Sequence, residues 1–244
     1  MAVVETVRVA WRWGGEAEIE GSVVEMKDLG FCNIGCNNST SHVTTHDLRS
    51  QHRTVISQGE FLSASLLDLP YLSYLDLSQT DFRQIQIPES IGSIVSLEHV
   101  DLPNANFRGT IPDHLGNLSR LQSLDLSGNS NSLQTNNLNW LRGLSSLLVL
   151  DLGGVDLSNV ADWLDAINML PSLVELTLFT CKLQILQPTL PYVKFTKLEL
   201  VDLSLNSFNS TMPSWLFSIS HSLVSLNLSR SQSQGLIPNT FENT

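Results

Sequence analysis

Residues 94–118 read IVSLEHVDLPNANFRGTIPDHLGNL, and this stretch decides the fold. It carries an apolar ladder, Ile94, Leu97, Val100 and Leu102, followed by polar residues and an Ile-Pro pair. The third ladder position recurs at spacings of 25, 24, 26, 26, 25 and 25 residues, as Leu75, Val100, Leu124, Leu150, Leu176, Val201 and Leu226. A unit this short cannot bury its own leucines, so the copies are expected to stack into a solenoid with one shared core.

Each copy also carries the pattern of a half-buried strand, because apolar and polar residues alternate around its last two ladder positions. Stacked copies therefore predict a parallel sheet in which Leu75 and Leu77 point inward and the residues between them point outward. The outward positions form three lanes with one residue per copy. The first lane is Tyr74, His99, Ser123, Val149, Glu175, Leu200 and Ser225; the second is Asp76, Asp101, Asp125, Asp151, Thr177, Asp202 and Asn227; the third is Ser78, Pro103, Ser127, Gly153, Phe179, Ser204 and Ser229.

The chain must turn after each strand, and the residue at that turn is informative. Asn129 and Asn206 stand there in two copies, where an Asn side chain is expected to bond backbone groups of the bend. Cys181 takes the same position in another copy, which predicts a buried structural thiol. Trp140 and Trp163 fall behind the strands and are expected to pack on the convex side of the solenoid.

Composition and length favour one elongated body of 244 residues with 42% hydrophobic residues. About seven repeats are expected over residues 69–244, preceded by a cap and first strand over 31–68 that includes Val43, Thr44 and Thr45. Residues 1–30 show neither the repeat nor a helical period. The net charge of −11 disfavours binding to nucleic acid or anionic lipid, although an acidic surface attracts a basic protein.

No motif of enzymatic chemistry is found, so we predict no catalytic residue, no metal site and no cofactor. His42 and His46 have the spacing of a zinc-protease helix, but the glutamate of that motif is absent and the stretch is β-branched. The nucleophile motif G-x-S-x-G, the phosphate-binding loop and the kinase motifs are also missing.

Two features of the outward lanes are candidate binding features. The aspartates of the second lane fit either a solvated structural lane or a site for calcium or a basic ligand; adjacent like charges repel by only about 1 kcal/mol in water, so no cation is required. Tyr74, His99, Glu175 and Phe179 depart from the small polar residues of their lanes. They fit either a protein-recognition patch or ordinary surface variation.

The repeat resembles the plant extracellular leucine-rich repeat class, LxxLxxLxLxxNxLxGxIPxxL, which residues 94–118 match almost throughout. The stretch WLRGLSSLLVLDLGGVDLSNVADWLDAINMLPSLVELTLFTCKL, residues 140–183, is similar to receptor-like proteins of the group containing the ethylene-inducing-xylanase receptors, which sense microbial molecules in defence. The resemblance spans about residue 35 to the end. It implies an α/β right-handed leucine-rich repeat solenoid with a parallel sheet on its concave face.

The resemblance also implies a function and a location. It implies a non-catalytic ligand-recognition module of a plant cell-surface receptor-like protein in defence signalling, at the extracellular face of the plasma membrane. Its partners would be a peptide, protein or glycan ligand and a receptor-kinase co-receptor. The alternatives are a secreted inhibitor of a microbial cell-wall-degrading enzyme and a nonfunctional truncated receptor fragment.

The resemblance gives expectations for the two ends of the chain and for its modification. Family members have a paired-cysteine cap, for which Cys32 and Cys36 are the candidate disulfide, although the helical half of that cap is not recognisable here. Family members continue through further repeats to a membrane helix, whereas this chain stops at Thr244, where an eighth repeat is expected to begin, so a truncated product or fragment is expected. No signal peptide or membrane span is visible in this chain. Candidate N-glycosylation sequons begin at Asn37, Asn38, Asn117, Asn209 and Asn227.

Overall fold

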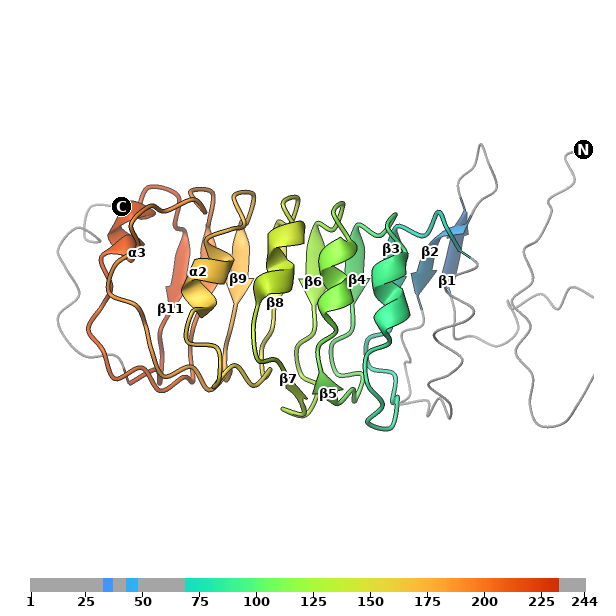
Figure 1. Ribbon diagram of the computed structural model, residues 1–244, viewed down its shortest axis with the longest axis horizontal. Coiled ribbons are helices and arrows are strands. Elements are labelled where there is room, and N and C mark those ends of the chain that lie inside the picture. The colour runs from blue at the N-terminus through green and yellow to red at the C-terminus, as the bar shows by residue number, and fades with distance from the viewer. Residues whose placement is uncertain (1–32, 37–42, 48–68, 233–244) are drawn as a thin grey trace, which may run out of the picture.

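The computed structural model describes residues 33–36, 43–47 and 69–232, and these form a stack of repeats (Figure 1). The boundaries expected at residues 31 and 69 fall at or within stretches outside this description, so they remain predictions. Cys32, Asn37, Asn38 and His42 also lie outside the described residues, and with them the candidate Cys32–Cys36 disulfide.

One long sheet runs the length of the stack, in the order β1-β2-β3-β4-β6-β8-β9-β10-β11. From β2 onward every strand is parallel to the next, and the third ladder residues pair in register, Leu75 with Val100 and Val100 with Leu124. The parallel strands are β2 (Val43–Asp47), β3 (Tyr74–Asp76), β4 (His99–Asp101), β6 (Ser123–Asp125), β8 (Val149–Asp151), β9 (Glu175–Thr177), β10 (Leu200–Asp202) and β11 (Ser225–Asn227). The predicted parallel sheet is confirmed.

The first strands of the sheet differ in part from the prediction. Val43–Asp47 forms the expected strand β2, which also places His46 on a strand and not on a helix. Strand β1 (Asn33–Cys36) was not predicted and pairs antiparallel with β2. The described part of the sheet therefore begins with an antiparallel pair of strands, and the parallel strands follow it.

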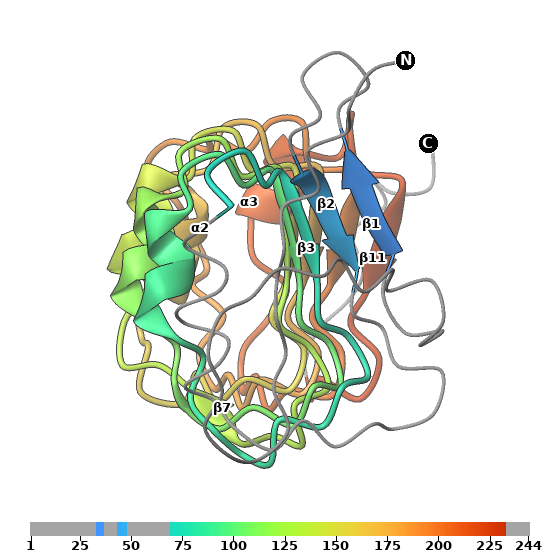
Figure 2. The same ribbon diagram turned by 90° about the vertical axis from the view of Figure 1, so that its right-hand side faces the viewer.

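Short helices form the opposite side of the stack from the sheet, as Figure 2 shows. They are the 3-10 helices η2 (Glu89–Ser93), η3 (Asp113–Asn117) and η4 (Asn139–Gly143), and the α-helices α2 (Trp163–Ile167) and α3 (Trp215–Ser218). Trp140 and Trp163 are 5% and 1% exposed on this side, which confirms their predicted packing. A second small parallel sheet joins β5 (Gly109–Thr110) and β7 (Leu133–Gln134).

Glycines let the 3-10 helices approach one another closely. A Cβ at Gly143 would lie 1.9 Å from the carbonyl oxygen of Gly116, and one at Gly116 would lie 2.5 Å from that of Trp140. These obstacles are backbone atoms of the preceding or following repeat. The close stacking of η3 and η4 therefore requires residues without a side chain at both positions.

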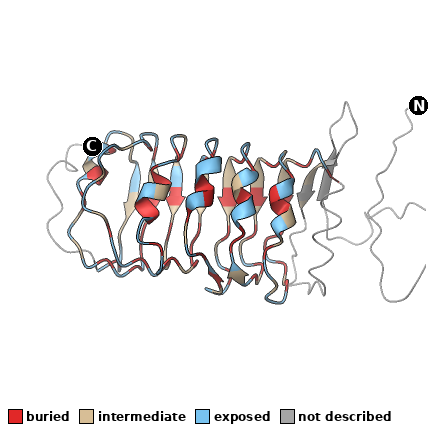
Figure 3. Ribbon diagram, in the orientation of Figure 1, coloured by how far each residue is buried: buried red, intermediate tan, exposed pale blue. Residues whose placement is uncertain are grey.

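The shared core lies between the two sides. The residue at the third ladder position is 0% or 1% exposed in each repeat from Leu75 to Val201, whereas Leu226 is half-buried. Figure 3 shows buried residues on the strands and on the short helices along the stack. Two turn asparagines tie neighbouring repeats together, as predicted. The Asn206 amide donates to the carbonyls of Leu178 and Leu203, and its oxygen accepts from the amides of Cys181 and Leu183, at 2.8 to 3.1 Å. Asn129 bonds Leu102, Leu126 and Phe107 in the same way.

Candidate functional site

The candidate site is the outer sheet face. We define it as the three outward lanes of β3 to β11 together with the residue directly before each of these strands, which is Ser73, Glu98, Gln122, Leu148, Val174, Glu199 or Val224. From β3 to β10 its side chains stand on strands that are bonded to a strand on each side, and β11 is the last strand of the described sheet, bonded to β10. The positions of these side chains are therefore held by the stacked repeats. None of the residues in the three lanes is Lys or Arg, whereas Asp and Glu occur at six lane positions: Asp76, Asp101, Asp125, Asp151, Glu175 and Asp202. The face is therefore rigid and acidic.

The aspartates of the second lane have a structural role. The carboxylates of Asp76, Asp125, Asp151 and Asp202 each accept a hydrogen bond from the backbone amide two residues later, at 2.7 to 2.9 Å. Asn227 accepts the same bond from Ser229 and donates to Asp202 Oδ2 at 2.9 Å. These bonds stabilise the turn that follows each strand, so the lane is explained without a bound cation.

Asp101 is the exception in this lane, because the residue two positions later is Pro103, which has no amide hydrogen. Burial raises the pKa of Asp101, while a hydrogen bond with the Tyr74 hydroxyl acts to lower it. The same hydroxyl lies 3.3 Å from Asp76 Oδ2, to which it donates. Burial, followed by the hydrogen bond to Asp101, raises the pKa of Tyr74, so this phenol stays protonated between two carboxylates, either of which can accept its single hydrogen.

Asp151 lies at the centre of the described part of the lane. Burial is the main cause that raises its pKa to about 6, and the charges of Asp125 and Asp202 act in the same direction. The bond from the Gly153 amide opposes this rise. The Asp151 carboxylate is therefore protonated at a higher pH than an ordinary aspartate.

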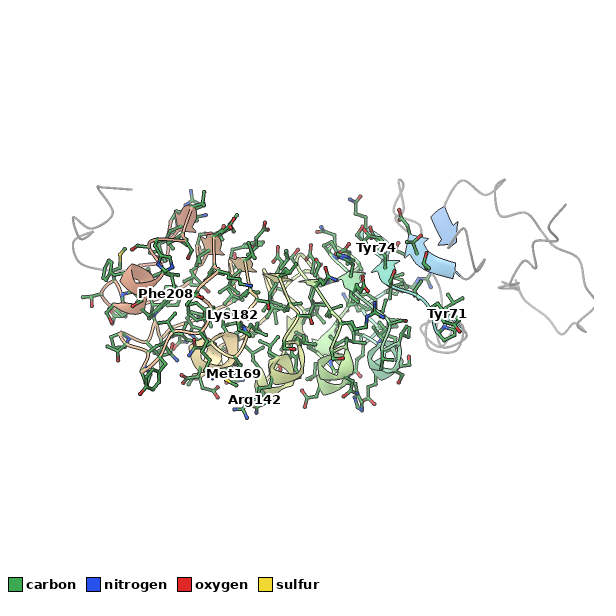
Figure 4. All side chains as sticks on the ribbon, turned by 90° about the horizontal axis from the view of Figure 1, so that it is seen from above. Tyr71, Tyr74, Arg142, Met169, Lys182 and Phe208 are labelled. Carbon is green, nitrogen blue, oxygen red and sulfur yellow. The ribbon has the colours of Figure 1, made fainter. Side chains whose placement is uncertain are left out.

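The structure divides the four predicted recognition residues into two pairs. Tyr74 and His99 are neighbours on β3 and β4, with ring centroids 5.7 Å apart. Glu175 and Phe179 belong to β9 and the turn after it, and four strand steps of about 4.8 Å place Glu175 about 19 Å from Tyr74. Figure 4 shows Tyr74 on the sheet side, and Arg142 and Met169 on the helical side.

The side chain of Phe179 lies against Gly153, in the turn that follows the neighbouring strand β8. A Cβ at Gly153 would lie 2.0 Å from Phe179 Cε1, so the ring occupies the space that any side chain at Gly153 would need. The phenyl ring is half-buried as a result. Glu175 is exposed and forms no ion pair with another described residue.

Sequence reasoning did not single out an apolar group at the start of strands β8 to β11. We call it the aliphatic patch: Leu148, Val149, Val174, Leu200 and Val224. Val224 is 83% and Leu148 38% exposed, and the other three are half-buried. The sequence does carry a sign of this patch. The two positions before the third ladder residue hold polar or aromatic residues in the first three repeats, and aliphatic residues occur there in the later repeats.

The described sequons differ in their surroundings. Asn117, at the end of η3, and Asn209 are exposed, whereas Asn227 is half-buried and bonded within the second lane. Their glycosylation remains a prediction.

Cys181 is the buried structural thiol that the sequence predicted. It is 0% exposed, and its Sγ donates to the carbonyl oxygen of Leu152 at 3.1 Å. Burial raises the pKa of the thiol to about 12, which leaves it unreactive.

Comparison with known proteins extends the resemblance to most of the chain. The Leucine Rich Repeat family pattern matches residues 96–118. The chain is 37% identical to receptor-like protein EIX1 and 38% identical to receptor-like protein EIX2 of Solanum lycopersicum, in each case across 94% of its length. The chain is related to the plant leucine-rich repeat receptor-like proteins.

The leucine-rich repeat fold is also found in solved structures. The ectodomain of the Arabidopsis thaliana receptor kinase GASSHO1/SCHENGEN3 matches 88% of this chain with a TM-score of 0.65 and 23% identity, a level that shows the shared fold alone. The chain spans 22% of the length of EIX1 and of EIX2. Within the described residues, no helix of this leucine-rich repeat stack has the length and hydropathy needed to span a membrane.

Proposed function

We propose that this chain is a non-catalytic ligand-recognition region of a plant cell-surface receptor-like protein that acts in defence signalling. The similarity to EIX1 and EIX2 across 94% of the chain is the observation that carries the proposal. The outer sheet face is its ligand surface, at the extracellular side of the plasma membrane. The ligand is a peptide, protein or glycan, and a receptor-kinase co-receptor transmits the signal.

The physical character of the face supports a recognition role. From β3 to β10 its side chains stand on strands fixed by backbone bonds on both sides, so binding there requires little rearrangement of the protein. The face combines carboxylates with the exposed residues of the aliphatic patch, and exposed apolar residues that lie together are typical of protein interfaces. Tyr74, His99, Glu175 and Phe179 are proposed contacts within it.

Binding to secreted microbial enzymes tests this proposal against the inhibitor alternative. The purified chain is titrated with a fungal xylanase and a fungal polygalacturonase, and complex formation and polysaccharide hydrolysis are measured in the same samples. We expect a complex in which the enzyme keeps its activity and which Leu200→Asp weakens. A complex that loses activity in proportion to bound chain would support the inhibitor, and binding unaffected by Leu200→Asp would contradict the role of the face.

A further inference from the structure

Two glutamates are set among the residues of the aliphatic patch, in two adjacent rows across the strands. In the row at the strand starts, backbone bonds of 2.8 Å link Leu148 to Val174, Val174 to Glu199, and Glu199 to Val224. In the next row, Glu175 pairs with Val149 on one side and Leu200 on the other. Each glutamate therefore has an aliphatic neighbour on both sides.

Both carboxylates are available to a ligand. Glu175 and Glu199 are exposed, and neither forms an ion pair with another described residue. Glu98, which precedes β4 in the row of Glu199, instead bonds Arg120. The three lanes contain no Lys or Arg that could neutralise Glu175 from a neighbouring strand. The patch thus presents uncompensated negative charge on an apolar surface.

This pattern complements long basic side chains. The stems of Lys and Arg pack on apolar groups while the charged head remains free to pair, and Arg in addition forms two parallel bonds to one carboxylate. A partner that is only apolar would leave both glutamates desolvated without a counter-charge, which disfavours it. A partner that is only basic would leave the exposed Val224 and Leu148 uncovered.

The spacing of the two glutamates further restricts the ligand. Glu199 aligns with Val174, so it lies one strand across and one residue back from Glu175. A strand spacing of about 4.8 Å and a rise of about 3.3 Å put their Cα atoms about 6 Å apart. Residues i and i+2 of an extended segment lie about 6.6 Å apart and project to the same side.

We propose that the aliphatic patch with Glu175 and Glu199 binds an extended peptide segment that carries two basic residues two positions apart, flanked by aliphatic residues. The inference rests on the proposed recognition function and gives it a ligand class and a position, over β8 to β11. Selection from a random dodecapeptide library against the full chain tests both. We expect enriched sequences of the form basic-x-basic with adjacent Leu, Ile or Val.

The best enriched peptide is then synthesised and its Kd measured against matched variants. The double substitution Glu175→Gln and Glu199→Gln keeps the side-chain shape, removes both charges and is expected to weaken binding about tenfold or more, since one lost charge-assisted bond is worth about 1.5 kcal/mol or more. Raising the salt concentration should weaken binding to the unchanged chain more than to this variant.

Two control variants should leave the affinity unchanged. Glu98→Gln makes the same chemical change in the same row at a carboxylate that is already paired with Arg120. Tyr192→Ala removes the side chain of a residue that is 80% exposed. The backbone carbonyl of Tyr192 accepts a hydrogen bond from Asn168, the residue that follows α2, so Tyr192 lies on the helical side. Equal weakening by Glu98→Gln would overturn the proposed position.

Hydrogen–deuterium exchange with the bound peptide separates failure of this inference from failure of the proposed function. Protection confined to β8–β11 supports the inference. Enrichment of neutral or acidic peptides that protect the outer sheet face overturns the ligand class and leaves the recognition function standing. The absence of any enriched peptide would contradict the inference. Enriched peptides that protect only the helical side would contradict both the inference and the proposal that the outer sheet face is the ligand surface.

Discussion

Single residues on the outer sheet face stabilise the fold and also set the charge of the surface. The second-lane carboxylates accept bonds from the turns that follow them, yet they also give the face its charge. A substitution in this lane therefore changes the stability of a turn together with the electrostatics of the face. Isosteric changes that keep the bond and remove the charge separate the two effects.

Asp151 gives a pH-dependent test of this kind. Its pKa of about 6 in the folded chain exceeds the ordinary value of 3.8, so the folded state holds the proton more tightly than the unfolded state. The associated stability is fully present below pH 3.8 and is lost as the pH rises through 6. Asp151→Asn keeps an oxygen for the Gly153 amide and should not show this loss.

The measurement is urea unfolding of both proteins across this pH range. The free energy of unfolding of the unchanged chain should fall relative to that of the variant as the pH rises. Ionisable groups that do not interact with Asp151 contribute equally to both profiles and cancel in the comparison. Parallel pH profiles would show that Asp151 titrates at its ordinary value.

The contact between Gly153 and Phe179 is testable by a double-mutant cycle. Gly153→Ala places a methyl group in the space of the Phe179 ring and is expected to cost about 1–3 kcal/mol, measured by chemical denaturation. In a Phe179→Ala background the same change should be neutral or slightly stabilising, because alanine reduces the entropy of the unfolded chain. An unchanged cost in that background would show that the ring does not occupy this space.

At the scale of elements, no strand or helix in the described part of the repeats is long enough to be stable alone. The strands from β3 to β11 in the long sheet span three residues each, and the longest helices of the described chain span five. Isolated helices of that length are unstable in water. Their stability therefore comes from contact with the same element of the next repeat.

The glycine contact between η3 and η4 tests this dependence. Gly143→Ala directs a methyl group at the backbone oxygen of Gly116, which cannot move without separating two repeats. We expect a loss of about 3 kcal/mol in the free energy of unfolding by guanidinium, at the upper end for overpacking. Arg142→Ala, at the exposed neighbouring position, should change it by about 0.5 kcal/mol or less. Similar effects of the two substitutions would argue against close stacking here.

At the scale of the whole molecule, each repeat contacts only its neighbours, so the cost of a core substitution depends on its place in the stack. Leu150 is 0% exposed on β8, and Leu150→Ala is expected to cost about 2–5 kcal/mol. Leu226, the corresponding residue of β11, is only half-buried. Leu226→Ala should cost less than about 2 kcal/mol, since less apolar area is lost from the core. Equal costs in denaturant unfolding would contradict this gradient.

Much of the architecture could be predicted because burial is periodic in the sequence. The ladder positions predicted the parallel strands and their register, and the turn position predicted the bonds of Asn129 and Asn206. The antiparallel strand β1 could not be predicted, since it carries no repeat and its pairing depends on β2. The aliphatic patch was also missed, because its apolar residues stand out only when the strand starts of several repeats are compared with one another.

The sequence by itself therefore determined the repeat, the sheet and the residues that face outward, because an apolar residue at a fixed period has one way to be buried. Only the tertiary structure decided which outward carboxylates are without an ion pair among the described residues and which outward residues contact another side chain. Phe179 covers Gly153, Glu98 is paired with Arg120, and Glu175 and Glu199 remain open beside exposed valine and leucine side chains. Exposure and charge compensation depend on residues that lie a whole repeat apart in the chain, and so they arise only when the repeats are stacked.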